Sequence, residues 1–123
     1  MNVFVAENSV TMDEGVESML AGIPHIEVVG HSVDEQDAID QIDTLLPDAL
    51  ILDLIMQSGS GVKVLESVKK HHAGIKVMVL THYSGKEYAD SCRSAGADCF
   101  FDKSFQLAQV REVLRQWTNE SKF

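Results

Sequence analysis

The sequence predicts an α/β fold in which helices cover both faces of a five-stranded parallel sheet. Five short apolar runs alternate with five longer amphipathic runs, which is typical of successive βα units. The third apolar run, residues 49–52, has no polar residue, as expected for a strand that is buried on both faces of a parallel sheet. A Gly- and Ser-rich turn at residues 57–61 follows it.

Each element can be assigned in chain order. We expect strands at residues 3–6, 26–30, 49–53, 76–81 and 99–102, because apolar and β-branched residues predominate there. We expect helices at about residues 10–21, 33–45, 62–72, 86–95 and 106–118, where apolar residues recur at three- and four-residue spacing. Ser32 and Glu35 have the spacing of a capping box before the second helix. Gly22 and Gly96 stand where helix C-terminal caps are expected.

Composition limits the class of protein. A chain of 123 residues with 45% apolar content fits one domain over residues 1–123, and with only a short tail after the last helix we expect no output domain in this chain. No apolar segment has the length of a membrane span, and no basic leader precedes the first strand, so we expect a cytoplasmic protein. Cys92 and Cys99 lack metal or redox spacing. The formal charge of −9 argues against nonspecific binding to nucleic acid.

Polar residues follow four of the predicted strands. Glu7 and Asn8 follow the first strand, Asp53 ends the third, Thr81 ends the fourth and Lys103 follows the fifth. In a doubly wound sheet with strand order 2-1-3-4-5, these carboxyl ends converge at one edge. The set combines oxygen donors, a carboxylate, a hydroxyl and an ammonium, which suits divalent-metal binding and charge neutralisation around a carboxylate nucleophile.

In this order and spacing, the polar residues make the chain similar to the receiver domains of two-component response regulators. The residues that carry the resemblance are the Glu7–Asn8 pair, Asp53 with the glycines at 59 and 61, Thr81, and the segment AGADCFFDK at residues 95–103. The resemblance extends over essentially the whole chain. It implies a flavodoxin-like receiver fold with five strands and five helices.

The resemblance also implies a phosphotransfer function. Asp53 would accept a phosphoryl group from a histidine kinase or a histidine phosphotransfer protein. Mg²⁺ would be held by Glu7, Asn8, Asp53 and the backbone carbonyl of Ile55. Thr81 and Lys103 would bind phosphoryl oxygens, and Phe100 would be the switch aromatic that turns inward as Thr81 moves.

The chain departs from the family pattern near Asp53. Asn8 replaces a second acid, so we expect weaker Mg²⁺ binding. Ser104 replaces a proline whose peptide bond is commonly cis, and we expect a trans bond after Lys103 because a non-proline cis bond costs about 3–4 kcal/mol. His82 follows Thr81 where a small residue is usual, and we expect its ring to crowd the approach to Asp53 or to constrain the movement of Phe100.

Two further residues concern the rate at which a phosphoryl group would be lost, and a third concerns the loop after Asp53. Ile55 and Tyr83 stand at the two variable positions that tune phosphoryl lifetime in receivers. Neither side chain orients an attacking water well at neutral pH, so we expect slow self-hydrolysis. Gln57 replaces the proline that is usual in the loop after the phosphoacceptor, which predicts a less constrained loop.

Taken singly, the same residues have simpler interpretations. Asp53 would be a turn or cap residue, Thr81 a β-former at a strand end, Lys103 a solvated lysine and Phe100 part of the core. The chain as a whole could be a degenerate receiver that binds partners without being phosphorylated, as Asn8 and His82 would permit.

Two other function classes are disfavoured by the residues. A small-cofactor binder of flavodoxin type would need a phosphate-binding loop after the first strand, where Glu7 would repel a phosphate. An enzyme of hydrolase type is not expected, since no Ser-His-acid arrangement is visible.

We expect a stand-alone receiver that acts on a downstream protein, with a domain of a longer regulator as the alternative. The surface expected for this contact is formed by the fourth helix, the fifth strand and the fifth helix. Its polar and aromatic residues form a mixed patch: Lys86, Tyr88, Arg93, Gln109 and Arg111.

Overall fold

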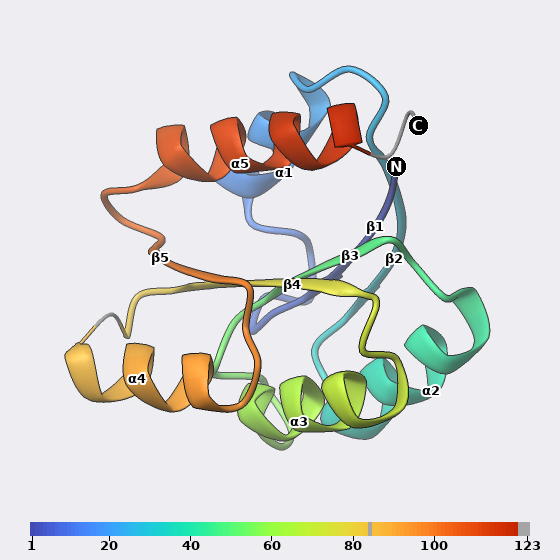
Figure 1. Ribbon diagram of the computed structural model, residues 1–123, viewed down its shortest axis with the longest axis vertical. Coiled ribbons are helices and arrows are strands. Elements are labelled where there is room, and N and C mark those ends of the chain that lie inside the picture. The colour runs from blue at the N-terminus through green and yellow to red at the C-terminus, as the bar shows by residue number, and fades with distance from the viewer. Residues whose placement is uncertain (84, 121–123) are drawn as a thin grey trace.

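A computed structural model describes residues 1–83 and 85–120 and contains the predicted five-stranded sheet (Figure 1). The strands are β1 (Asn2–Ala6), β2 (Glu27–Ser32), β3 (Ala49–Leu52), β4 (Lys76–Thr81) and β5 (Cys99–Asp102). All neighbouring strands pair in parallel in the order β2-β1-β3-β4-β5, which confirms the predicted fold class. Residues 121–123, the end of the expected tail, lie outside the described residues.

The helices alternate with the strands and cover both faces of the sheet. They are α1 (Glu14–Ala21), α2 (Glu35–Leu45), α3 (Gly61–His71), α4 (Lys86–Ser94) and α5 (Leu107–Glu120). Helices α1 and α5 lie together on one face, and α2, α3 and α4 lie on the other (Figure 1). Within the described residues, no helix combines the length and the apolar character that crossing a membrane requires.

Two apolar layers hold the helices against the sheet, because successive strand residues point to opposite faces. In β1, Val3 and Val5 pack with the layer under α1 and α5, whereas Phe4 and Ala6 pack with the layer under α2 and α3. All four residues of β3 are buried, as expected for a central parallel strand. The sheet is therefore a rigid platform for the loops at its carboxyl edge.

The first helix begins later than predicted, at Glu14 rather than at residue 10. Asp13 is its N-cap and accepts hydrogen bonds from the backbone N–H groups of Gly15 and Val16. Residues 7–13 therefore form a loop that runs along the carboxyl edge of the sheet.

The predicted capping box at Ser32 and Glu35 is wrong, because the N-cap of α2 is Asp34. Asp34 accepts a hydrogen bond from the N–H of Asp37, and this bond lowers the pKa of the Asp34 carboxyl. The Ser32 hydroxyl donates instead to the Asp37 carboxylate. Glu35 accepts from the N–H of Ser60, which ties α2 to the loop before α3.

The predicted C-terminal caps are confirmed. Gly22 is the C-cap of α1, and its N–H donates to the carbonyl of Ser18. Gly96 directly follows the C-cap of α4 and has a φ of 102°, a conformation that glycine adopts without a steric penalty.

Candidate functional site

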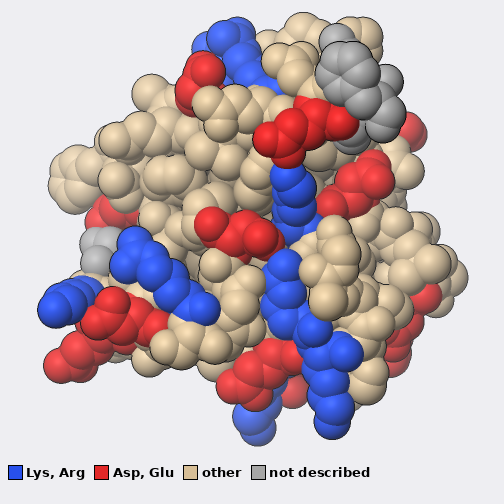
Figure 2. Space-filling model, viewed as in Figure 1, with Lys and Arg blue, Asp and Glu red and all other residues tan. Residues whose placement is uncertain are grey.

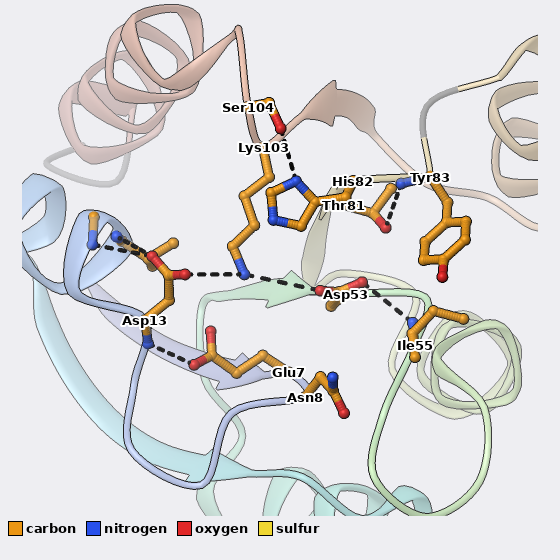
Figure 3. A network of polar contacts seen from close by, with 12 residues as sticks. Glu7, Asn8, Asp13, Asp53, Ile55, Thr81, His82, Tyr83, Lys103 and Ser104 are labelled. Carbon is orange, nitrogen blue, oxygen red and sulfur yellow. Dashed lines mark hydrogen bonds and ion pairs between the residues drawn. The ribbon is translucent and has the colours of Figure 1, made fainter.

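The carboxyl ends of β1, β3, β4 and β5 meet at one edge of the sheet, and the predicted site residues gather there (Figure 3). Glu7 directly follows β1, Asp53 follows β3, Thr81 ends β4 and Lys103 follows β5. The Lys103 ammonium lies 3.8 Å from Oδ2 of Asp53. The parallel register thus brings together residues that are far apart in the sequence.

Asp53 is a buried carboxylate with 7% of its surface exposed. Its backbone N–H donates to the carbonyl of Ala6, which continues the pairing of β3 with β1. Oδ1 accepts a hydrogen bond of 3.2 Å from the N–H of Ile55, and Oδ2 faces Lys103. Both oxygens therefore have defined surroundings before any ligand binds.

The loop after Asp53 depends on two glycines. A Cβ atom at Gly61 would lie 2.1 Å from the carbonyl oxygen of Asp53, so only glycine fits without moving the backbone. Gly59 has a φ of +84°, and a Cβ there would also collide with Glu35. The two glycines carry the chain from the end of β3 into α3 directly behind the carboxylate.

Lys103 is nearly buried, with 10% of its side chain exposed. Its ammonium lies 3.7 Å from Oδ2 of Asp13 and 3.8 Å from Oδ2 of Asp53, so two carboxylates share one positive charge. Sequence reasoning missed Asp13. An aspartate just before a helical run is a typical N-cap, and that signal would have placed it at this edge of the sheet.

Glu7 is also buried, with 3% of its surface exposed. Its Oε1 accepts a hydrogen bond of 2.8 Å from the N–H of Asp13 and lies 3.4 Å from Nε2 of His31. His31 was not predicted as a neighbour of the site. It stands in β2 opposite Val5, and only the strand register reveals the contact.

Asn8 lies beside a small hollow above Asp53. The hollow has a volume of about 280 Å³ and is lined by Asn8, Asp53, Ile55, His82 and Tyr83. The backbone carbonyl of Asn8 accepts a hydrogen bond from the side chain of Gln57, which links the loops after β1 and β3. The Gln57 side chain thus makes a contact that a proline could not make.

Thr81 is fully buried, and its Oγ1 accepts a hydrogen bond from the N–H of Tyr83. The ring of His82 is bonded through Nδ1 to the Ser104 hydroxyl at 2.8 Å (Figure 3). No described peptide bond is cis, which confirms the trans bond expected after Lys103. Phe100 is partly buried and packs against the apolar layer under α2 and α3.

The donors at this edge suit a hard divalent cation. Glu7 and Asp53 supply two buried carboxylates, Asn8 and Ile55 would add an amide oxygen and a backbone carbonyl, and oxygen is the ligand atom that Mg²⁺ prefers. Among the described residues, no group of three or more His, Cys, Asp and Glu side chains is arranged to hold a metal. Uncharged oxygens would therefore have to complete the coordination.

Comparison with known proteins agrees with the fold. VraR, a response regulator protein of Staphylococcus saprophyticus, is 34% identical over 110 residues, which is 89% of this chain and 53% of VraR. The chain thus spans about half the length of this relative.

Solved structures are similar over most of the chain. The response regulator domain of Thermotoga maritima CheB superposes with a TM-score of 0.80 at 22% identity, covering 98% of this chain and 94% of that one. A chain of the CheX–CheY–BeF₃–Mg²⁺ complex from Borrelia burgdorferi gives a TM-score of 0.84 at 17% identity, covering 94% of this chain and 87% of that one. These two structures support the fold. The family model for the response regulator receiver domain matches residues 3–115, so the chain belongs to the response regulator receiver domain family.

Proposed function

We propose that the chain is a cytoplasmic phosphoacceptor whose Asp53 takes a phosphoryl group from a histidine kinase or a histidine phosphotransfer protein. The observation that supports this best is a buried carboxylate that borders a hollow of about 280 Å³ and faces a nearly buried ammonium. A turn or cap aspartate would need neither the hollow nor the ammonium. The reaction modifies the chain's own side chain, so it is not turnover of a separate substrate.

In the transfer step, a carboxylate oxygen of Asp53 attacks phosphorus. The phosphorus–nitrogen bond of the donor phosphohistidine breaks, and its electron pair stays on the imidazole nitrogen. Lys103, whose ammonium lies 3.8 Å from Asp53, would neutralise charge on the phosphoryl oxygens. The Thr81 hydroxyl accepts a hydrogen bond from the Tyr83 N–H, and its own hydrogen would donate to a phosphoryl oxygen. Phosphoryl transfer depends mainly on such positioning and charge neutralisation.

Mg²⁺ would be held by Glu7, Asp53, the side-chain oxygen of Asn8 and the backbone carbonyl of Ile55. When bound, the ion offsets the repulsion between the carboxylates and the incoming phosphoryl group. The Glu7 carboxylate is already oriented at this edge, because its Oε1 accepts a hydrogen bond from the N–H of Asp13. Asn8 contributes an oxygen without charge, so the site would need a higher Mg²⁺ concentration than one with an aspartate at this position.

We propose that phosphorylation changes the positions of Thr81 and Phe100 and that a downstream protein reads the change on the α4–β5–α5 surface. The predicted contact residues on this surface are all exposed: Lys86, Tyr88, Arg93, Gln109 and Arg111. On the molecular face seen in Figure 2, basic and acidic side chains are interspersed although the chain carries a charge of −9. A partner with local charge complementarity therefore fits better than a uniformly basic one.

Three residues around the hollow would tune the reaction. Ile55 and Tyr83 are roughly half exposed at its rim and offer no group that orients water well at neutral pH. The ring of His82 also lines the hollow and is held there by Ser104. We propose that these three side chains slow both entry of the donor and hydrolysis of the aspartyl phosphate.

A second candidate is a degenerate receiver that binds a partner without being phosphorylated. Two observations favour it: Asn8 removes a charge from the metal site, and the bond between His82 and Ser104 links the loops after β4 and β5. In this case the α4–β5–α5 surface would be read in a single conformation.

Phosphorylation of the purified chain separates the two candidates. With Mg²⁺ and acetyl phosphate, the intact mass is expected to rise by one phosphoryl group in the wild type and not in Asp53→Asn. Asp48→Asn is the matched control, because it removes the same charge at the opposite end of β3 and should still be phosphorylated. The degenerate receiver predicts no mass gain and no change in the NMR signals of Thr81 and Phe100 on adding beryllofluoride.

A further inference from the structure

The Lys103 ammonium forms ion pairs with two carboxylates, those of Asp13 and Asp53 (Figure 3). Its distance to Oδ2 of Asp13 is 3.7 Å, and its distance to Oδ2 of Asp53 is 3.8 Å. Both distances exceed those of hydrogen bonds, so Lys103 forms two ion pairs of similar length and hydrogen-bonds to neither carboxylate. The side chain that would neutralise a phosphoryl group is thus partly engaged elsewhere.

Asp13 is held firmly in this position by its other contacts. Its N–H donates to Oε1 of Glu7 at 2.8 Å. Its Oδ1 accepts from the N–H groups of Gly15 and Val16 at 3.0 and 3.2 Å, as the N-cap of α1. These bonds fix the carboxylate so that Oδ2 faces Lys103.

We propose that Asp13 is a positioning residue that restrains Lys103 and thereby weakens binding of the phosphoryl group at Asp53; this rests on the proposed phosphoacceptor function. A phosphoryl group adds negative charge next to Asp53, and the ion pair with Asp13 holds the Lys103 ammonium back from moving toward it. The fixed charge of Asp13 also repels the phosphoryl oxygens. Both effects favour the unmodified state of the receiver.

The simpler role for Asp13 is that of an N-cap alone. Asn and Ser are also good N-caps, because each keeps a side-chain oxygen for the first-turn N–H groups. Asp13→Asn and Asp13→Ser therefore remove the charge and preserve α1. A residue that acts only as a cap would leave anion binding unchanged in both variants.

Titration with beryllofluoride in the presence of Mg²⁺, followed by backbone amide NMR, measures the effect on anion binding. We expect both Asp13 variants to bind it about three- to tenfold more tightly than the wild type, as estimated for one charge removed near a partly desolvated site. Asp48→Asn, at the far end of β3, is expected to stay within about twofold, because salt and distance screen its charge. Equal affinities in wild type and both Asp13 variants would overturn the proposal.

The ¹⁵N signal of the Lys103 ammonium, recorded without any anion, tests the restraint directly. It should shift in Asp13→Asn and stay in place in Asp48→Asn. If the wild type fails to bind beryllofluoride, the phosphoacceptor function is wrong, and the Lys103 signal still decides whether Asp13 restrains the lysine. If the wild type binds and the Lys103 signal is identical in Asp13→Asn, the restraint is wrong and the phosphoacceptor function stands.

Discussion

Replacing Gly61 with alanine tests how tightly the loop after Asp53 is packed. The added Cβ would lie 2.1 Å from the carbonyl oxygen of Asp53 and 2.8 Å from Cα of Leu54. Both neighbours are backbone atoms at the end of a central strand, and Gly61 itself begins α3. Neither side can yield by a change of rotamer, so the strand end and the helix must move apart.

The cost of this movement can be estimated from overpacked cores. Inserting a methyl group into a well-packed site typically costs 1–3 kcal/mol, and a backbone collision lies at the upper end, at about 3 kcal/mol. For a domain of this length, 1 kcal/mol lowers Tm by about 4 °C, so we expect a loss of roughly 12 °C. Asp53 moves with its carbonyl, so phosphorylation by acetyl phosphate should also slow.

Thermal unfolding followed by circular dichroism measures the change in stability. Gly74→Ala is the matched control, since nothing lies within 4 Å of the added Cβ and its φ is not positive. Its Tm should be unchanged or slightly higher, because alanine lowers the entropy of the unfolded chain. If Gly61→Ala and Gly74→Ala unfold within about 2 °C of each other, the reasoning about this loop is refuted.

Four further outcomes follow from the site and the core. Asn8→Asp should raise Mg²⁺ affinity about tenfold in a calorimetric titration, and equal affinities would contradict the role of Asn8. The aspartyl phosphate should decay slowly because Ile55 and Tyr83 orient water poorly; a lifetime of seconds at saturating Mg²⁺, measured by intact mass, would refute this. Burial raises the pKa of Cys99 to about 12, so peptide mapping should show alkylation at pH 8 roughly 1,000-fold slower than for an unfolded thiol. The Cys99 thiol ionises above pH 9 in the unfolded chain, whereas the folded protein keeps it protonated to about pH 12. Ionisation therefore lowers the free energy of unfolding as pH rises above 9, and the midpoint of thermal unfolding should fall over the same range.

Strand positions followed closely from the sequence because apolar runs and buried strands coincide. β4 and β5 have the predicted bounds, since polar or turn residues lie close to both ends of each run: Gly74 and His82 for β4, Asp98 and Lys103 for β5. The start of the first helix was harder to predict. Val10 and Met12 extend the apolar pattern of that helix toward the N-terminus, but both residues lie before it in the structure. Val10 is 69% exposed in a loop, and Asp13 starts the helix instead. A local cap decided the boundary against the periodicity.

The error at Ser32 and Glu35 has a similar cause. Both side chains have the right chemistry for a capping box, but each forms a hydrogen bond with another residue instead. Asp37 accepts from the Ser32 hydroxyl, and the N–H of Ser60 donates to Glu35. Sequence spacing describes bonds within one turn of helix. It carries no information about a loop that arrives 25 residues later.

The site residues were predicted as a set because each one ends or follows a strand. Their contacts could not be predicted in the same way. The pairing of Lys103 with Asp13 depends on how a loop after β1 reaches a loop after β5, and the contact of His31 with Glu7 depends on strand register. Such side-chain geometry is set by packing across the fold, and spacing in the chain does not encode it.

The hydrogen bond between His82 and Ser104 has an evolutionary consequence. These residues are two departures from the family pattern, and the structure makes them partners at 2.8 Å. Residues in direct contact have non-additive effects, so substitutions at the two positions are expected to be epistatic. Restoring proline at position 104 alone would leave the imidazole without its hydroxyl partner. Across related receivers, histidine at the first position and a hydroxyl at the second should therefore be gained and lost together.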